Sequence, residues 1–112
     1  MHRVTTYSMI YRSRTDIISE ILEAANGGGG AIKAKIMYHA FLSHDQMKEY
    51  LTLLTENGLL NYDIYTRKFK TTEKGLRFLD IYNQMSDIVK SQINKSNINY
   101  SEVPGKGEVN IP

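Results

Sequence analysis

Cysteine is absent from the 112-residue sequence, and proline occurs only twice. Without cysteine the chain has no disulfide framework, no thiolate zinc site and no cysteine nucleophile. It also lacks the run of about eighteen apolar residues that a membrane-spanning helix needs. The basic start, MHRVTTYSMIYRSR, has no apolar core or cleavage site of a secretory signal. Length and a hydrophobic content of 41% therefore predict one globular domain with no membrane partner. The absence of cysteine is compatible with a reducing cytoplasm, which is where we expect the protein.

Residue groups that would indicate catalysis or metal binding are missing as well. Carboxylates are scattered singly, and no serine, histidine and acid follow one another at a spacing that supports a triad. His39 and His44 are five residues apart, so they do not share a helical face, and they lack a third ligand. The glycines at 27–30 are not followed by the lysine and hydroxyl residue of a phosphate loop. We expect no enzyme, no metal and no cofactor, and we interpret the glycines as a turn.

Basic charge is clustered, although the net charge of +2 is mild. Residues 64–77 contain five lysines and arginines against one acidic residue, Glu73. At the other end of the chain, three arginines precede the first acidic residue, Asp16. Clusters of this kind are typical of surfaces that meet phosphate groups.

Helical periodicity begins after the N-terminal arm, residues 1–12. Ser13 and Asp16 have the spacing of a helix start. The apolar residues that follow recur on one helical face: Ile17, Ile18, Ile21, Leu22 and Ala25. Residues 26–30, NGGGG, end this helix, because glycine continues a helix only at a cost. We expect a short strand at 31–32 and a short second helix at 33–40.

The third helix has the best specified start in the chain. Ser43 is a favourable N-cap, and Gln46 three residues later completes a capping box. The apolar stripe of this helix consists of Met47, Tyr50, Leu51 and Leu54. Gly58 follows Asn57 at the position of a C-terminal glycine cap.

A hairpin and a long helix follow. Residues 59–72, LLNYDIYTRKFKTT, alternate with period two on both sides of an interruption at 63–66, which predicts a β-hairpin. Thr72 is suited to cap a last helix that runs from Glu73 to about Ser96. The tail, residues 97–112, contains both prolines and no apolar period, and we expect it to be disordered.

This order of elements predicts a fold that is mainly α with a small β-hairpin. A helix-turn-helix followed directly by a two-stranded hairpin is the winged-helix arrangement. We assign residues 13–80 to a winged-helix DNA-binding domain and residues 81–96 to a coiled-coil dimerisation segment.

Several motifs of the chain resemble those of a known family. They are K-x-K-I-M-Y-x-A at 33–40, L-S-x-x-Q at 42–46, Y-L-x-L-L at 50–54, E-N-G-L-L at 56–60 and T-T-E-K-G-L-R-F-L at 71–79. Together they resemble the small archaeal winged-helix DNA-binding proteins and transcriptional regulators, the group that includes the ten-kilodalton DNA-binding protein of Sulfolobus. The resemblance covers about residues 13–85. It implies DNA binding and a homodimer joined by an antiparallel coiled coil of C-terminal helices.

Twelve residues are candidates for DNA contact. A winged helix presents the N-terminal half of its third helix to base edges, while hairpin cations meet the sugar-phosphate backbone. On this pattern the candidates are Arg12, Arg14, Lys33, Lys35, Ser43, His44, Gln46, Lys48, Thr52, Arg67, Lys68 and Lys70. The alternatives are a solvated helix face and a hairpin whose charge only protects its edge. Asp45 and Glu49 favour the alternatives, because both repel phosphate.

The last helix carries an apolar seam. Its residues recur at alternating spacings of three and four, with neighbours that widen the stripe. The seam residues are Phe78, Ile81, Tyr82, Met85, Ile88, Val89, Gln92 and Ile93. Because an exposed stripe of this kind is unusual on a monomer, we expect a homodimer.

Two functions of different class remain. The first is a dimeric protein that binds double-stranded DNA in the nucleoid, as a transcriptional regulator or an architectural chromatin protein. The second is a winged helix that serves as a protein-interaction module without strong DNA affinity. Salt-dependent binding to duplex DNA distinguishes them.

Overall fold

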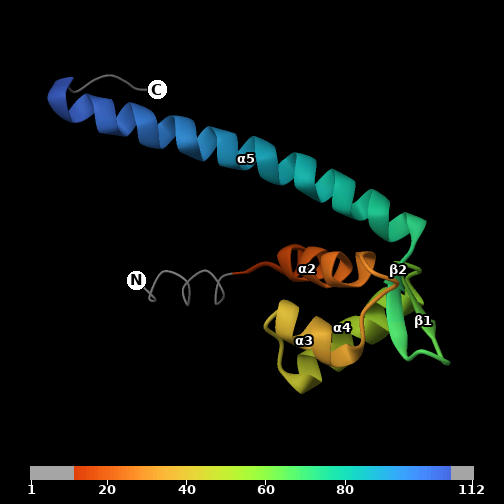
Figure 1. Cartoon of the computed structure of the whole chain (residues 1–112). Helices are drawn as coiled ribbons and strands as arrows, with labels where there is room; N and C mark the ends of the chain where they lie inside the picture. The colour runs from red at the N-terminus through yellow and green to blue at the C-terminus, as the bar shows by residue number, and fades with distance from the viewer. Residues whose placement is uncertain (1–11, 107–112) are drawn as a thin grey trace. The chain divides into compact units, whose positions relative to one another are not determined.

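The computed structural model describes the backbone of residues 12–106 and the side chains of residues 12–90. Within this part of the chain the elements follow in the order α2 (Arg14–Asn26), α3 (Lys33–His39), α4 (His44–Glu56), β1 (Leu60–Asp63), β2 (Lys68–Thr71) and α5 (Glu73–Lys106) (Figure 1). Contacts divide the chain into two compact units, residues 1–79 and residues 80–112. The first unit holds the helix-turn-helix and the hairpin, and it is mainly helical as the sequence predicts.

Both helix starts follow the capping boxes of the sequence. The Asp16 N–H donates to Ser13 Oγ at 3.0 Å, and the Ser13 N–H donates to the Asp16 carboxylate at 3.0 Å. Ser43 and Gln46 form the same reciprocal pair at the start of α4, at 3.0 and 3.1 Å. Each box gives two otherwise free N–H groups a partner. The starts of α2 and α4 are therefore fixed by local sequence.

The hairpin is antiparallel, and it is extended by a short third segment. Leu60 pairs with Thr71, and Tyr62 pairs with Phe69. Ala31 forms an isolated bridge with Phe69, with N···O distances of 2.8 and 2.9 Å, where the sequence predicts a short strand. Gly30 has a φ of 109°, and a Cβ at this residue would lie 2.7 Å from the carbonyl oxygen of Phe69. Because a side chain at this position would collide with the Phe69 carbonyl group, only glycine permits the close approach. The last residue of the glycine turn therefore lies directly against the hairpin, just before α3 begins.

The core of the first unit lies where α2, α3 and α4 meet the hairpin. Its largest fully buried side chains are Ile21, Leu22, Ile36, Met47, Leu54 and Leu60. Leu79, near the start of α5, is also buried in this cluster, and Phe78 packs against it. The core thus holds α3 and α4 in the helix-turn-helix arrangement and leaves the opposite face of α4 exposed.

α5 is longer than the sequence predicts. It begins at Glu73 as expected, after Thr72, whose hydroxyl accepts the Gly75 N–H at 3.1 Å. It continues to Lys106, whereas the expected end is near Ser96 and residues 97–106 are expected in a disordered tail. No glycine or proline interrupts the chain between Ser96 and Val103, so the helix meets no strong stop signal until its last turn, which contains Pro104 and Gly105. Residues 107–112 of the expected tail lie outside the described residues.

Among the helices of the described residues, none has the length and apolar character needed to cross a membrane.

Candidate nucleic-acid interface

The exposed face of α4 carries the residues that the sequence assigns to base contact. His44, Lys48 and Thr52 are exposed and lie one helical turn apart, on the side away from the core. Ser43 and Gln46 are exposed too, but an oxygen of each is engaged in the capping box. Ser43 and Gln46 therefore fix the start of α4. The outward surface of the helix carries His44, Lys48 and Thr52.

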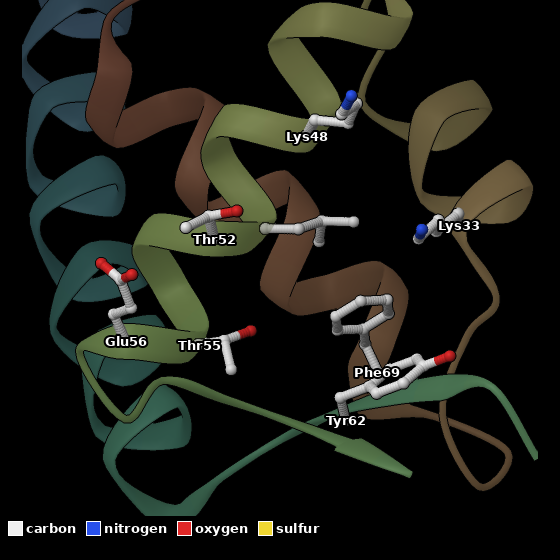
Figure 2. Close-up of a pocket in the computed structure, with 8 residues that line it drawn as sticks. Lys33, Lys48, Thr52, Thr55, Glu56, Tyr62 and Phe69 are labelled. Atoms are coloured by element: carbon white, nitrogen blue, oxygen red, sulfur yellow. The ribbon is translucent and has the colours of Figure 1, made fainter. Parts of the chain in front are cut away.

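A hollow of about 390 Å³ separates α4 from the hairpin. Figure 2 shows Lys33 of α3 and Lys48 of α4 beside it, with Tyr62 of β1 and Phe69 of β2 at its base. The remaining lining residues are Leu51, Thr52, Thr55 and Glu56 of α4. The fold therefore places two lysines from different helices at one concave, mostly apolar surface.

A second hollow joins the start of α3 to the end of the hairpin. It measures about 360 Å³ and is lined by Ile32, Lys33, Ala34, Tyr62 and Arg67. Lys33 and Tyr62 border both hollows, so the two hollows are neighbours. Cations from α3, α4 and the hairpin consequently border one surface.

The loop between the two strands, residues 64–67 (the hairpin loop), is held by Asp63. Its carboxylate accepts the Tyr65 N–H at 2.9 Å and the Thr66 N–H at 3.4 Å. The hydrogen bond from the Tyr65 N–H is the main reason that the pKa of Asp63 lies below its ordinary value. Arg67 closes the loop, with its N–H donating to the Asp63 carbonyl at 2.7 Å and a φ of 59°.

The hairpin cations differ in exposure. Arg67 and Lys70 are exposed, whereas Lys68 is half-buried. Lys33 and Lys35, at the start of α3, are exposed as well. All five lie in the first unit.

The two arginines that precede or open α2 have contacts within the domain. Arg12 pairs with Glu20 and donates to the Ala40 carbonyl at 2.6 Å and to the Phe41 carbonyl at 3.3 Å. The sequence predicts Arg12 as a DNA contact, and in the structure its guanidinium joins the end of α3 to α2. Arg14 is exposed, and its guanidinium lies 5.3 Å from the centre of the Tyr50 ring.

Acidic residues interrupt the surface. Asp45 and Glu49 are exposed on α4, and Glu56 lines the first hollow. Among the described residues, no three histidine, aspartate or glutamate side chains are grouped closely enough to hold a metal ion. The surface thus combines a mostly apolar hollow with cations and hydrogen-bonding groups at its border, interrupted by carboxylates.

Two aromatic residues of this surface are not among those assigned from the sequence. Tyr62 and Phe69 line the first hollow, and their ring centres lie 4.7 Å apart. The period-two pattern indicates that both lie on a hairpin, but it does not indicate which surface they border. The signal that would have found them is their cross-strand pairing, because directly opposite residues share one face of a hairpin.

The predicted seam of α5 is exposed along most of its described length. Ile81 and Ile88 are 62% and 63% exposed, and Met85 and Val89 are more than half exposed. Phe78 and Tyr82 are half-buried, and Phe78 packs against the core of the first unit. The side chains of Gln92 and Ile93 lie outside the described residues.

Comparisons with known proteins agree on the fold. A family model described as winged helix-turn-helix matches residues 11–90. Among solved structures the chain is similar to Sso10a-2, a DNA-binding protein from Sulfolobus solfataricus, with a TM-score of 0.65 and 19% identity. That match covers 88% of this chain and 100% of the other. No curated protein sequence matches. The resemblance inferred from the sequence motifs is confirmed.

Proposed function

Because the chain belongs to the winged helix-turn-helix family, we propose that it binds double-stranded DNA, and that it does so as a homodimer. The observation that carries the proposal is the placement of Lys33, Lys48 and Arg67 around two neighbouring hollows formed by α3, α4 and the hairpin. Three cations on separate elements of a rigid core are suited to follow a phosphate backbone. The likeness to Sso10a-2, itself a DNA-binding protein, supports the same function.

Each part of the surface has its own role in this proposal. The exposed row on α4, His44, Lys48 and Thr52, enters the major groove, which is about 12 Å wide and admits a helix. The cations outside this row contact the phosphates on either side: Arg14, Lys33, Lys35, Arg67, Lys68 and Lys70. Arg12 is left out of the interface, because Glu20 and two carbonyl groups already engage it.

The homodimer rests on the exposed stripe of α5. Ile81, Met85, Ile88 and Val89 recur at spacings of four, three and one, which places them on one side of the helix. Pairing with the same stripe of a second copy in a coiled coil removes these side chains from water. The family resemblance favours an antiparallel pair, which would give each dimer two DNA-binding units.

Within this function the protein acts in the nucleoid of the cytoplasm as a transcriptional regulator or an architectural chromatin protein. The second candidate function is a protein-interaction module, and Asp45 and Glu49 favour it because both are exposed on the face of α4 proposed to meet DNA. The two functions differ in salt-dependent affinity for duplex DNA, which only the first requires.

Replacing Lys48 by alanine tests whether α4 reads sequence. We expect Lys48→Ala to weaken binding to a preferred duplex by about 1–3 kcal/mol more than binding to random duplex, if the lysine hydrogen-bonds to guanine. Fluorescence anisotropy with a preferred duplex selected from a random pool and with the unselected pool measures both affinities. Equal weakening of both would make Lys48 a phosphate contact, and no weakening of either would favour the interaction module.

A further inference from the structure

The end of the hairpin carries two consecutive apolar side chains that the proposed phosphate contacts do not use. Ile64 is 71% exposed, and Tyr65 is 93% exposed. Single exposed apolar residues are ordinary on a protein surface. Here, however, both lie in the hairpin loop, and the hairpin extends from the helical part of the first unit (Figure 1).

The backbone that carries them is held in one conformation. The Asp63 carboxylate accepts two N–H groups of the hairpin loop, and its carbonyl accepts the N–H of Arg67. A loop fixed in this way loses little conformational entropy when its side chains enter a binding site. The two apolar side chains therefore project from a backbone that is held in one conformation.

The cations in and next to the hairpin loop indicate which class of macromolecule the loop contacts. Arg67 belongs to the loop itself and lines a hollow with Lys33, and Lys68 follows directly. An apolar partner protein would leave these cations without compensation, whereas a duplex offers phosphates on both sides of an apolar stack of bases. An apolar end flanked by cations is thus complementary to a groove of DNA.

We propose that Ile64 and Tyr65 form a wedge that enters the minor groove and partly separates two stacked base pairs. This inference rests on the proposed DNA binding and goes beyond it, because it assigns a deformation of the duplex to two residues. The minor groove is about 6 Å wide, and paired strands are about 5 Å apart before their side chains are added. Only the end of the hairpin can enter the groove, and Ile64 and Tyr65 are the apolar side chains at that end, beside Thr66 and Arg67.

The chemistry of the two residues suits this role. Isoleucine is among the apolar residues that architectural proteins insert between base steps. The tyrosine ring can stack on the base that is exposed, as aromatic side chains do on single-stranded nucleic acid. Arg67, beside them, contacts a phosphate at the edge of the minor groove. Steps that unstack easily, TA above all, are the preferred points of insertion.

The test uses a duplex with several TA steps whose adenines are replaced by 2-aminopurine, a base that fluoresces strongly only when it is unstacked. The full-length protein is titrated at low salt, and anisotropy of an end label on the same duplex measures binding in parallel. The wild type should raise 2-aminopurine fluorescence several-fold. The double variant Ile64→Ser, Tyr65→Ser should still bind, with an affinity loss below about tenfold because the cost of unstacking is avoided, and should lose the rise.

Two further variants separate the wedge from general effects. Tyr65→Phe keeps the ring and should keep the rise. Tyr38→Ser removes a tyrosine that is 80% exposed on α3 and that lines neither hollow, and this variant should behave as the wild type. Binding by the wild type without any rise, or a rise that persists in the double variant, would overturn the wedge while leaving the proposed DNA binding intact. No binding to any duplex at low salt would overturn both.

Discussion

Replacing Ile88 by glutamate should convert the protein from a dimer into a monomer. Ile88 is 63% exposed in the single chain and lies in the centre of the stripe formed by Ile81, Met85 and Val89. In the proposed pair, each copy would bring a carboxylate against apolar side chains of the other. The free-energy cost of burying an unpaired carboxylate is larger than the stabilisation that a coiled coil of about two heptads contributes. Sedimentation equilibrium at micromolar concentration measures the change.

Asn83→Glu is the matched control for this variant. Asn83 is exposed on the side of α5 opposite Ile88, and the substitution adds the same carboxylate to the same helix. This control should remain dimeric. A wild type that sediments as a monomer would refute the homodimer, and dissociation of both variants would show that added charge rather than the seam is responsible.

Replacing Leu51 by alanine should destabilise the first unit by about 2–5 kcal/mol. Leu51 is 4% exposed and packs between the core and the base of the first hollow. Alanine leaves a cavity there that the neighbouring side chains fill only in part. For a domain of this size the loss corresponds to a fall in melting temperature of at least about 8 °C.

Thermal denaturation followed by circular dichroism measures this change, at one fixed protein concentration because dimerisation makes the melting temperature depend on concentration. Lys48→Ala is the control, since Lys48 is exposed on the same helix one turn away. Its melting temperature should change little. Equal destabilisation by both substitutions would contradict the assignment of the buried and exposed faces of α4.

Local signals made the helix starts predictable. Ser43 and Gln46 form their capping box from residues three apart, and no distant part of the chain is needed for it. The hairpin was predictable for a similar reason, because the period-two pattern lies on both sides of a short loop. The start of α5 follows from Thr72, whose hydroxyl accepts the Gly75 N–H.

Features that depend on distant residues were not predictable in the same way. Arg12 meets the carbonyl of Ala40, 28 residues away, so nothing in the basic arm indicates that this arginine is engaged within the domain. The hollow bordered by Lys33, Lys48 and Tyr62 likewise exists only after three elements have packed together. The position of the end of α5 was not predictable either, because the absence of an apolar period does not itself end a helix.

The dependence of duplex binding on salt tests the central claim most directly. The claim is that cations of α2, α3 and the hairpin contact phosphates. If each of the six cations assigned to this role neutralises one phosphate, the logarithm of the affinity should fall with that of the salt concentration, with a slope of about −5 to −6 for each DNA-binding unit. The six are Arg14, Lys33, Lys35, Arg67, Lys68 and Lys70. The measurement is a titration of random duplex at several salt concentrations, with the wild type and with the double variant Arg67→Ala, Lys68→Ala. The account predicts a steep slope for the wild type and a slope shallower by up to about two for the variant. Affinity that does not depend on salt, or an identical slope for both proteins, would contradict it.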